Sequence, residues 1–135
     1  MSFPIDQTYI EETERTLDVE FPAVYKAKME QNNGGAFGVG NDELFLYPFP
    51  DKADQKRITR TLTNIISETK SAKEWDGFPD NAVAIGDNGS GDILILLPSV
   101  ADSAKLEEKF FIWRHETGEI EEIEQSIEAL MSEVE

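Results

Sequence analysis

Residues 82–97 read AVAIGDNGSGDILILL, and this stretch decides the fold. Its two ends are short runs rich in apolar residues, at 82–86 and 92–97, while glycine, aspartate, asparagine and serine fill the middle. Apolar runs of this length, bounded by turn residues, predict buried strands. Glycine supplies positive φ, and Asp and Asn bond their own backbone, so the middle predicts a tight connection between two buried strands.

Outward from this stretch, two further strands are expected, at 43–47 and at 109–115. A glycine-rich stretch up to Gly40 leads into the first of them. Elsewhere, apolar residues recur at spacings of three and four, which predicts helices at 6–17, 22–33, 53–68 and 120–134. Helices at both ends with strands in the middle predict an α+β fold, in which helices flank a central, mainly antiparallel β-sheet.

Two of these segments carry expectations about individual side chains. The buried side of the helix at 53–68 is expected to consist of Ile58, Leu62, Ile65 and Ile66. The stretch 70–81 is expected to be a loop, which Trp75 and Phe78 anchor onto the body of the domain.

Length and composition bound the class of protein. The chain has 135 residues, about the length of one domain, and no repeat or linker divides residues 1–135. Lys and Arg total 12 against 28 Asp and Glu, a net charge of −16. That balance argues against nucleic acid or an anionic membrane as the partner, because phosphates need a basic face. The absence of cysteine excludes disulfides, thiolate zinc sites and thiol nucleophiles.

The sequence also carries an expectation about the compartment. The N-terminal MSFPIDQTYIEE has neither a basic nor an apolar region of the kind found in secretory signals. The longest apolar run, from Ile93 to Pro98, is far shorter than the ~20 residues that span a bilayer. We therefore expect a cytoplasmic protein.

The loop at 87–92 is a candidate site for an ion. Asp87, Asn88, Ser90 and Asp92 offer oxygen ligands, but the alternating acidic positions and distal Glu of a calcium loop are missing. The loop contains no lysine and leads into a strand, which argues against a phosphate cradle. His115 is the one histidine, and without a second histidine or a cysteine it has no partners for a metal or nucleophilic site. We therefore expect no catalytic residue, cofactor or metal, and a protein that is not an enzyme.

The C-terminal segment is strongly acidic. From residue 116 onward it contains no Lys or Arg, and its carboxylates are Glu116, Glu119, Glu121, Glu122, Glu124, Glu128, Glu133 and Glu135. This acidic segment has two interpretations. Such a face keeps a protein soluble and monomeric, or it is a docking surface that attracts a basic partner and speeds association.

Several motifs together resemble a known family, the SUKH superfamily (the SMI/KNR cell-wall-regulator group). The opening of the chain supplies FPAVYK at 21–26, NGG at 33–35 and LYP at 46–48. The later part supplies FP at 78–79, IGDNGSGD at 85–92 and IWRHETG at 112–118, in the same order and spacing, followed by SIEAL at 126–130. The resemblance covers nearly the whole chain and implies an α+β fold without agreed catalytic residues.

The resemblance also implies a function class. Bacterial members look like immunity proteins that bind and neutralise polymorphic toxins, many of them nucleases or deaminases, and fungal members look like regulatory interaction proteins. We therefore expect a basic toxin domain as the partner, occluded by direct contact. The alternative is a regulatory or scaffolding module with a non-toxin cellular partner. The chain itself is expected to be a monomer or a weak homodimer. The partner-binding residues predicted are Asp87, Asn88, Ser90, Asp92, Glu116, Glu119, Glu121 and Glu122.

Overall fold

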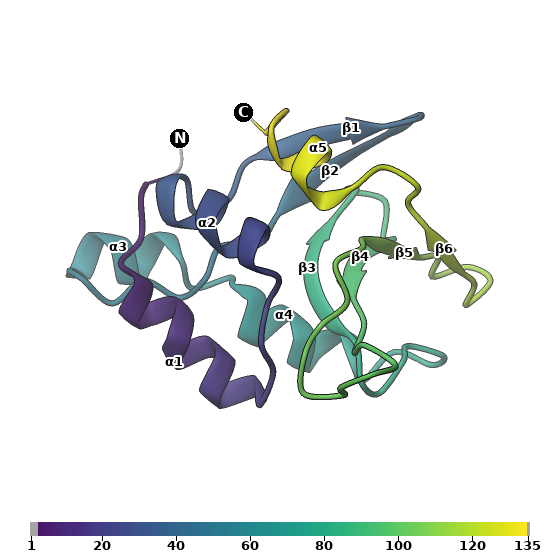
Figure 1. Cartoon of the computed structure of the whole chain (residues 1–135), viewed down its shortest axis with the longest axis horizontal. Coiled ribbons are helices and arrows are strands. Elements are labelled where there is room, and N and C mark those ends of the chain that lie inside the picture. The colour runs from purple at the N-terminus through teal and green to yellow at the C-terminus, as the bar shows by residue number, and fades with distance from the viewer. Residues whose placement is uncertain (1–2, 135) are drawn as a thin grey trace.

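The computed structural model describes residues 3–134, which form an α+β fold (Figure 1). In chain order, the elements are α1 (Gln7–Leu17), α2 (Ala23–Gln31), β1 (Ala36–Val39), β2 (Asp42–Leu46), α3 (Gln55–Arg60), α4 (Ile65–Ala72), β3 (Val83–Asp87), β4 (Ile93–Leu96), β5 (Phe111–Trp113), β6 (Ile120–Glu122) and α5 (Ile127–Met131). The predicted fold class is confirmed. In the described part of the chain, no helix is long and apolar enough to cross a membrane.

The strands form one sheet in the order β1-β2-β3-β4-β5-β6, and every neighbouring pair is antiparallel. The predicted pair at 82–86 and 92–97 is the β3–β4 hairpin, with Asp87 opposite Ile93. Its register shifts between Ala84 and Gly86. A Cβ on Gly86 would lie 2.6 Å from the carbonyl oxygen of Phe45, so glycine lets β2 approach β3 closely at this point.

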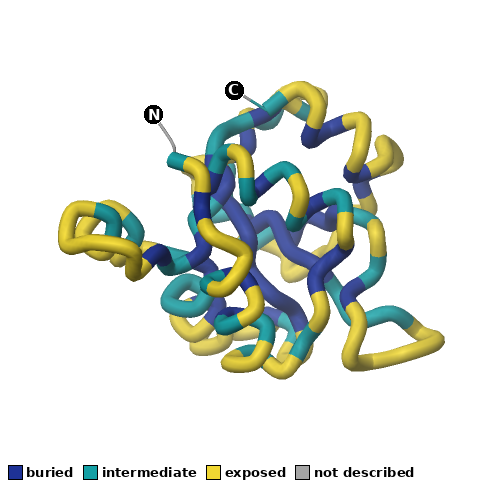
Figure 2. Tube along the Cα trace, turned by 60° about the vertical axis from the view of Figure 1, so that its left-hand side comes forward, coloured by how far each residue is buried: buried dark blue, intermediate teal, exposed yellow. Residues whose placement is uncertain are grey.

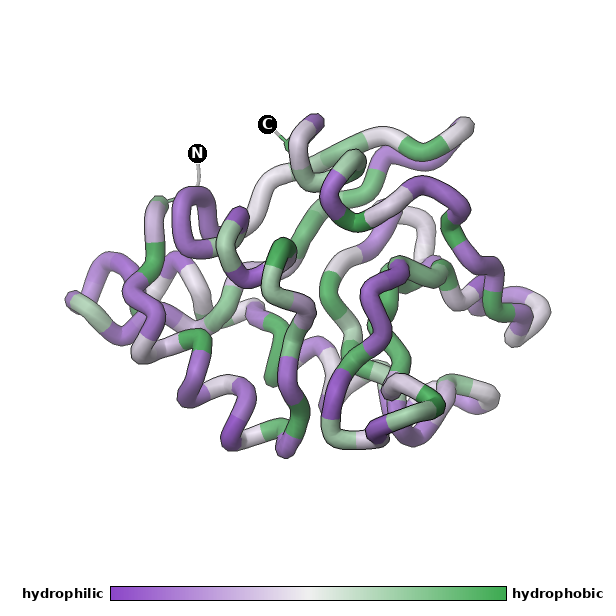
Figure 3. Tube along the Cα trace, in the orientation of Figure 1, coloured by the Kyte–Doolittle hydropathy of each residue, from purple (hydrophilic) through white to green (hydrophobic). Residues whose placement is uncertain are grey.

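Both faces of the β3–β4 hairpin are covered, which explains its unbroken apolar runs. Successive side chains of a strand point to opposite faces. Val83 and Ile85 join a large core with buried residues of α1, α2 and α5, whereas Ala84 joins a smaller core with Phe78 and Trp113. Hydrophobic residues are concentrated along these strands (Figure 3). The buried part of the chain runs through the middle of the molecule (Figure 2).

The motifs at 21–25 and 33–35 have structural roles in the large core. The rings of Phe21, Tyr25, Phe49 and Phe110 pack together, with Phe21 and Phe49 edge to face at 5.1 Å between ring centroids. The buried side chain of Asn33 donates to the carbonyl oxygen of Phe49 at 2.9 Å and accepts from its amide at 2.8 Å. Asn33 thus replaces a strand partner for the segment that follows β2.

The single helix predicted at 53–68 is wrong, because the chain forms α3 and α4 with a break at 61–64. Asn64 caps α4: its side chain accepts from the amide of Ser67, and the Ser67 hydroxyl accepts from the amide of Asn64. This capping box starts a new helix where the apolar spacing alone suggested continuation. Of the expected buried residues, Ile65 is fully buried and Leu62 is 66% exposed, with Ile58 exposed and Ile66 half-buried.

Three other expectations also need correction. The helix predicted at 120–134 is shorter: Ile120–Glu122 is β6, because it covers the open edge of β5, and α5 follows at Ile127–Met131. The glycine-rich stretch before Gly40 contains β1, which pairs with β2. The loop at 70–81 begins only after α4 ends at Ala72. Of its two anchors, Phe78 is buried and Trp75 is half exposed.

Candidate functional site

One arginine contacts carboxylates from two strands and from the β3–β4 loop. Arg114, directly after β5, donates from Nη2 to Asp42 at 3.1 Å and from Nη1 to Asp92 at 3.0 Å. It also forms two parallel hydrogen bonds with Glu121 of β6, at 2.9 and 3.1 Å. Because β2 and β6 are not neighbours in the sheet, this shared contact requires the sheet to curl around Arg114. We call Arg114, Asp42, Asp92, Glu121, Asn88 and His115 the Arg114 cluster.

Asn88 and His115 complete this cluster. The Asn88 amide nitrogen donates to Asp42 and Asp92, both at 3.0 Å, and its oxygen accepts from the backbone of the loop. The other oxygen of Asp92 accepts from the backbone amide of His115 at 3.1 Å and contacts the His115 ring nitrogen Nδ1 at 2.7 Å. The cluster therefore ties the β3–β4 loop to the end of β5.

These contacts favour the charged form of each carboxylate. Burial by itself raises the pKa of Asp92, but hydrogen bonds from His115, Arg114 and Asn88 outweigh it and lower that pKa to about 2. Hydrogen bonds from Arg114 likewise lower the pKa values of Asp42 and Glu121. A guanidinium already occupies the position among these oxygens. Within residues 3–134, no group of three His, Asp or Glu side chains is arranged to hold a metal ion.

The four predicted loop residues do not form one site. Asp92 and Asn88 belong to the Arg114 cluster, whereas Asp87 lies at the other end of the loop. Its carboxylate accepts from the Tyr47 hydroxyl at 2.8 Å and from the amide of Gly89 at 3.0 Å. Ser90 is exposed at the tip of the loop, where its amide donates to the Asn88 side chain.

The four predicted carboxylates around β6 also divide into two pairs. Glu121 is held by Arg114, and Glu122 pairs with Lys109 at 2.8 Å. Glu116 and Glu119 lie on the turn between β5 and β6, where both are exposed and the side chain of Glu116 is 85% accessible. The outward charge of this segment is therefore concentrated on Glu116 and Glu119.

Sequence reasoning missed Asp42 and Arg114. Arg114 is the one Lys or Arg after Lys109, and this single cation in a strongly acidic stretch is the signal that could have found it. No comparable signal marks Asp42, because its contact with Arg114 joins residues 72 positions apart and follows from the register of the sheet.

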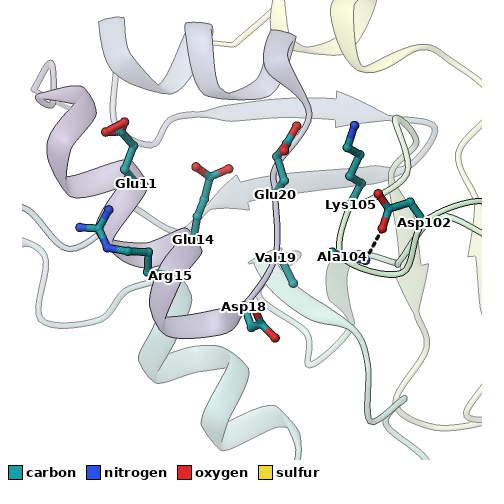
Figure 4. A pocket seen from close by; sticks show the side chains of 9 residues that line it. All are labelled: Glu11, Glu14, Arg15, Asp18, Val19, Glu20, Asp102, Ala104 and Lys105. Carbon is teal, nitrogen blue, oxygen red and sulfur yellow. Dashed lines mark hydrogen bonds between the residues drawn. The ribbon is translucent and has the colours of Figure 1, made fainter.

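A separate groove of about 510 Å³ lies between α1 and the loop that follows β4 (Figure 4). Its acidic side chains come from Glu11, Glu14, Asp18, Glu20 and Asp102. Figure 4 shows them pointing in different directions, and Glu14 is held by the amide of Phe21 and by Lys26. The groove therefore lacks the convergent polar groups that a catalytic site needs.

Comparison with known proteins agrees with the fold. The family model for the SMI1 / KNR4 family (SUKH-1) matches residues 4–133. No curated protein and no solved structure matches the chain. The match covers nearly all of the sequence, including the motifs that build the aromatic core, the β3–β4 loop and the Arg114 cluster. The chain therefore belongs to the SMI1 / KNR4 family (SUKH-1).

Proposed function

We propose that the protein is an immunity-type protein that acts in the cytoplasm, binding a toxin domain and neutralising it by covering its working surface. The observation that carries this proposal is the family match over residues 4–133 in a chain of net charge −16. The proposed role is binding, not catalysis.

The charge suggests how the partner is approached. A nuclease toxin is basic where it holds phosphates, so an acidic protein can occupy that groove in place of the nucleic acid. Glu116 and Glu119 project from the β5–β6 turn and carry the attraction over distance. This attraction is screened within ~8 Å at physiological salt, so lasting affinity requires buried contacts as well.

Co-expression with the protein encoded next to it tests the proposal. If that neighbour is a toxin, growth should be rescued and the two proteins should co-purify as a one-to-one complex. A harmless neighbour that does not bind would contradict the proposal and favour a regulatory module with a cellular partner.

Association kinetics with the same toxin test whether Glu116 and Glu119 attract the partner. Glu116→Gln with Glu119→Gln should slow association and flatten its dependence on salt, since both carboxylates are exposed and unconstrained. Glu108→Gln with Glu133→Gln removes the same charge from exposed positions elsewhere and is the matched control. Equal association rates for the two double variants would remove these two residues from the docking surface.

A further inference from the structure

A cavity of about 240 Å³ lies between α4 and the β3–β4 loop. Its walls include Tyr47, Glu68, Ser71, Trp75, Asp87 and Gly89. It is smaller than the pockets of about 300–1,000 Å³ that hold small-molecule ligands. Its size suits one side chain of a protein partner.

Trp75 gives this cavity an aromatic wall. Its ring is held edge to face against Trp113 and His115, both at 6.3 Å between ring centroids, yet 51% of the residue is exposed. A tryptophan side chain that neighbouring rings already hold in place loses little conformational entropy when it binds a partner. Exposed tryptophans of this kind are common anchors in protein interfaces.

Two carboxylates give the cavity its charge. Asp87 is held in position by the Tyr47 hydroxyl and the amide of Gly89, and Glu68 lies on α4 opposite the loop. Burial, and then the hydrogen bond to Asp87, raise the pKa of Tyr47, so its hydroxyl stays protonated and continues to donate. Among residues 3–134, none of those that line the cavity is Lys or Arg. The cavity is therefore acidic, aromatic and without a cation of its own.

The Arg114 cluster shows what such carboxylates bind when an arginine is within reach. There, Asp92 at one end of the loop shares a guanidinium with Asp42 and Glu121. Asp87, at the other end, has no arginine beside it in the cavity. A planar guanidinium also stacks on aromatic rings and pairs with carboxylates, which an ammonium does less well.

We propose that this cavity receives an arginine side chain of the protein partner, between the ring of Trp75 and the carboxylates of Glu68 and Asp87. This inference rests on the proposed function for the identity of the partner. The cavity supplies the buried anchor that the screened charges of Glu116 and Glu119 do not.

The first test uses N-acetyl-arginine amide as the probe and NMR of the indole N–H of Trp75 as the readout. This probe should bind saturably with a dissociation constant in the millimolar range, which corresponds to a binding free energy on the order of −4 kcal/mol. Glu68→Gln should weaken this binding about threefold or more, because it removes one charge next to the guanidinium. Ser71→Leu should abolish it by filling the cavity from exposed α4.

Glu74→Gln is the matched control, because Glu74 is exposed just beyond α4 and does not line the cavity. It should leave the affinity unchanged. An indole signal that does not saturate, or that responds equally in Glu68→Gln and Glu74→Gln, would overturn the proposal.

Dissociation kinetics of the complex with the toxin distinguish a failure of this inference from a failure of the proposed function. Glu68→Gln should speed dissociation about tenfold, the effect of losing a desolvated charge contact, with association little changed. If the protein rescues growth but Glu68→Gln dissociates like the parent, the immunity function stands and the arginine pocket is wrong. If the arginine probe binds the cavity and no toxin partner exists, the pocket stands and the immunity function is wrong.

Discussion

The two ends of the β3–β4 loop use the same residue type in opposite ways. Asp92 is surrounded by donors from Arg114, Asn88 and His115, whereas Asp87 is held by Tyr47 and a backbone amide at the rim of an acidic cavity. The charge of Asp92 is offset by Arg114 within the chain, whereas Asp87 is held by neutral donors and, in the proposal above, contacts a partner. The number of carboxylates in a segment therefore says little about how many are available to a partner.

The difference has an energetic basis. A chain of net charge −16 repels itself, and carboxylates brought together by curling the sheet would add to that repulsion. Arg114 offsets it where Asp42, Asp92 and Glu121 meet, through hydrogen bonds assisted by charge. Around the cavity, only Glu68 and Asp87 contribute carboxylates, so the fold tolerates them without an internal cation.

Removing Arg114 should give one of the two largest effects on stability. Arg114→Met leaves three partly buried carboxylates facing one another, and the free energy of unfolding should fall by about 2 kcal/mol, between the values for exposed and for buried ion pairs. Urea unfolding measures this change. Lys70→Met, at an exposed position of α4, is the control and should have little effect. Equal losses in the two variants would mean that the cluster contributes no more than an isolated surface charge.

Alanine substitutions at the two glycines of the loop, Gly89 and Gly91, compare its two ends directly. A Cβ on Gly91 would lie 2.9 Å from the His115 ring, at a φ of +103°, whereas a Cβ on Gly89, at +79°, meets nothing within 4 Å. Gly91→Ala should therefore lower the unfolding free energy by about 2 kcal/mol, from strain and displacement of His115. Gly89→Ala should cost about 1 kcal/mol, from backbone strain alone.

Thermal unfolding of both glycine variants gives the comparison, and NMR of the His115 ring gives its cause. Only Gly91→Ala should move the ring signal. An unchanged ring in that variant would show that the loop shifts as a whole, and would remove the rigid link between the loop and β5.

Sequence reasoning succeeded where structure is local. The apolar runs of β3 and β4, with glycines between them, predicted the hairpin because composition and turn chemistry agree there. The helix at 6–17 was likewise predicted with its cap, since Asp6 accepts from the amide of Thr8 at the start of α1. Both features depend on residues close together in the chain.

Sequence reasoning failed where contacts between residues far apart in the chain decide the structure. Ile120 and Ile123 have a helical spacing, yet residues 120–122 form β6 because the edge of β5 offers hydrogen bonds. The pairing of Arg114 with Asp42 depends on how far the sheet curls, which no local pattern encodes. The composition of residues 87–92 predicted a connection between strands, but the difference between its two ends depends on β2, β5 and α4, which lie far from it in the sequence.

Acid unfolding gives the smallest expected effect and tests the paired end of the loop by itself. The pKa of Asp92 falls from an ordinary 3.8 to about 2 in the folded state, so its charge stabilises the protein above pH 3.8. That contribution is lost as the pH drops from about 3.8 to about 2. With solvent screening it amounts to about 1 kcal/mol. Asp92→Asn should therefore lose less stability than the parent over this range, measured by urea unfolding at each pH.

Asp87→Asn is the matched control for this titration, because it removes the same charge from the other end of the loop. If the Arg114 cluster stabilises the charged form of Asp92, the curve of Asp92→Asn should be shallower than that of the parent as the pH falls, and the curves of the two variants should differ. Identical curves would mean that the Arg114 cluster draws no pH-dependent stability from Asp92. The distinction between a carboxylate committed to the fold and one left for a partner would then have to rest on the binding measurements alone.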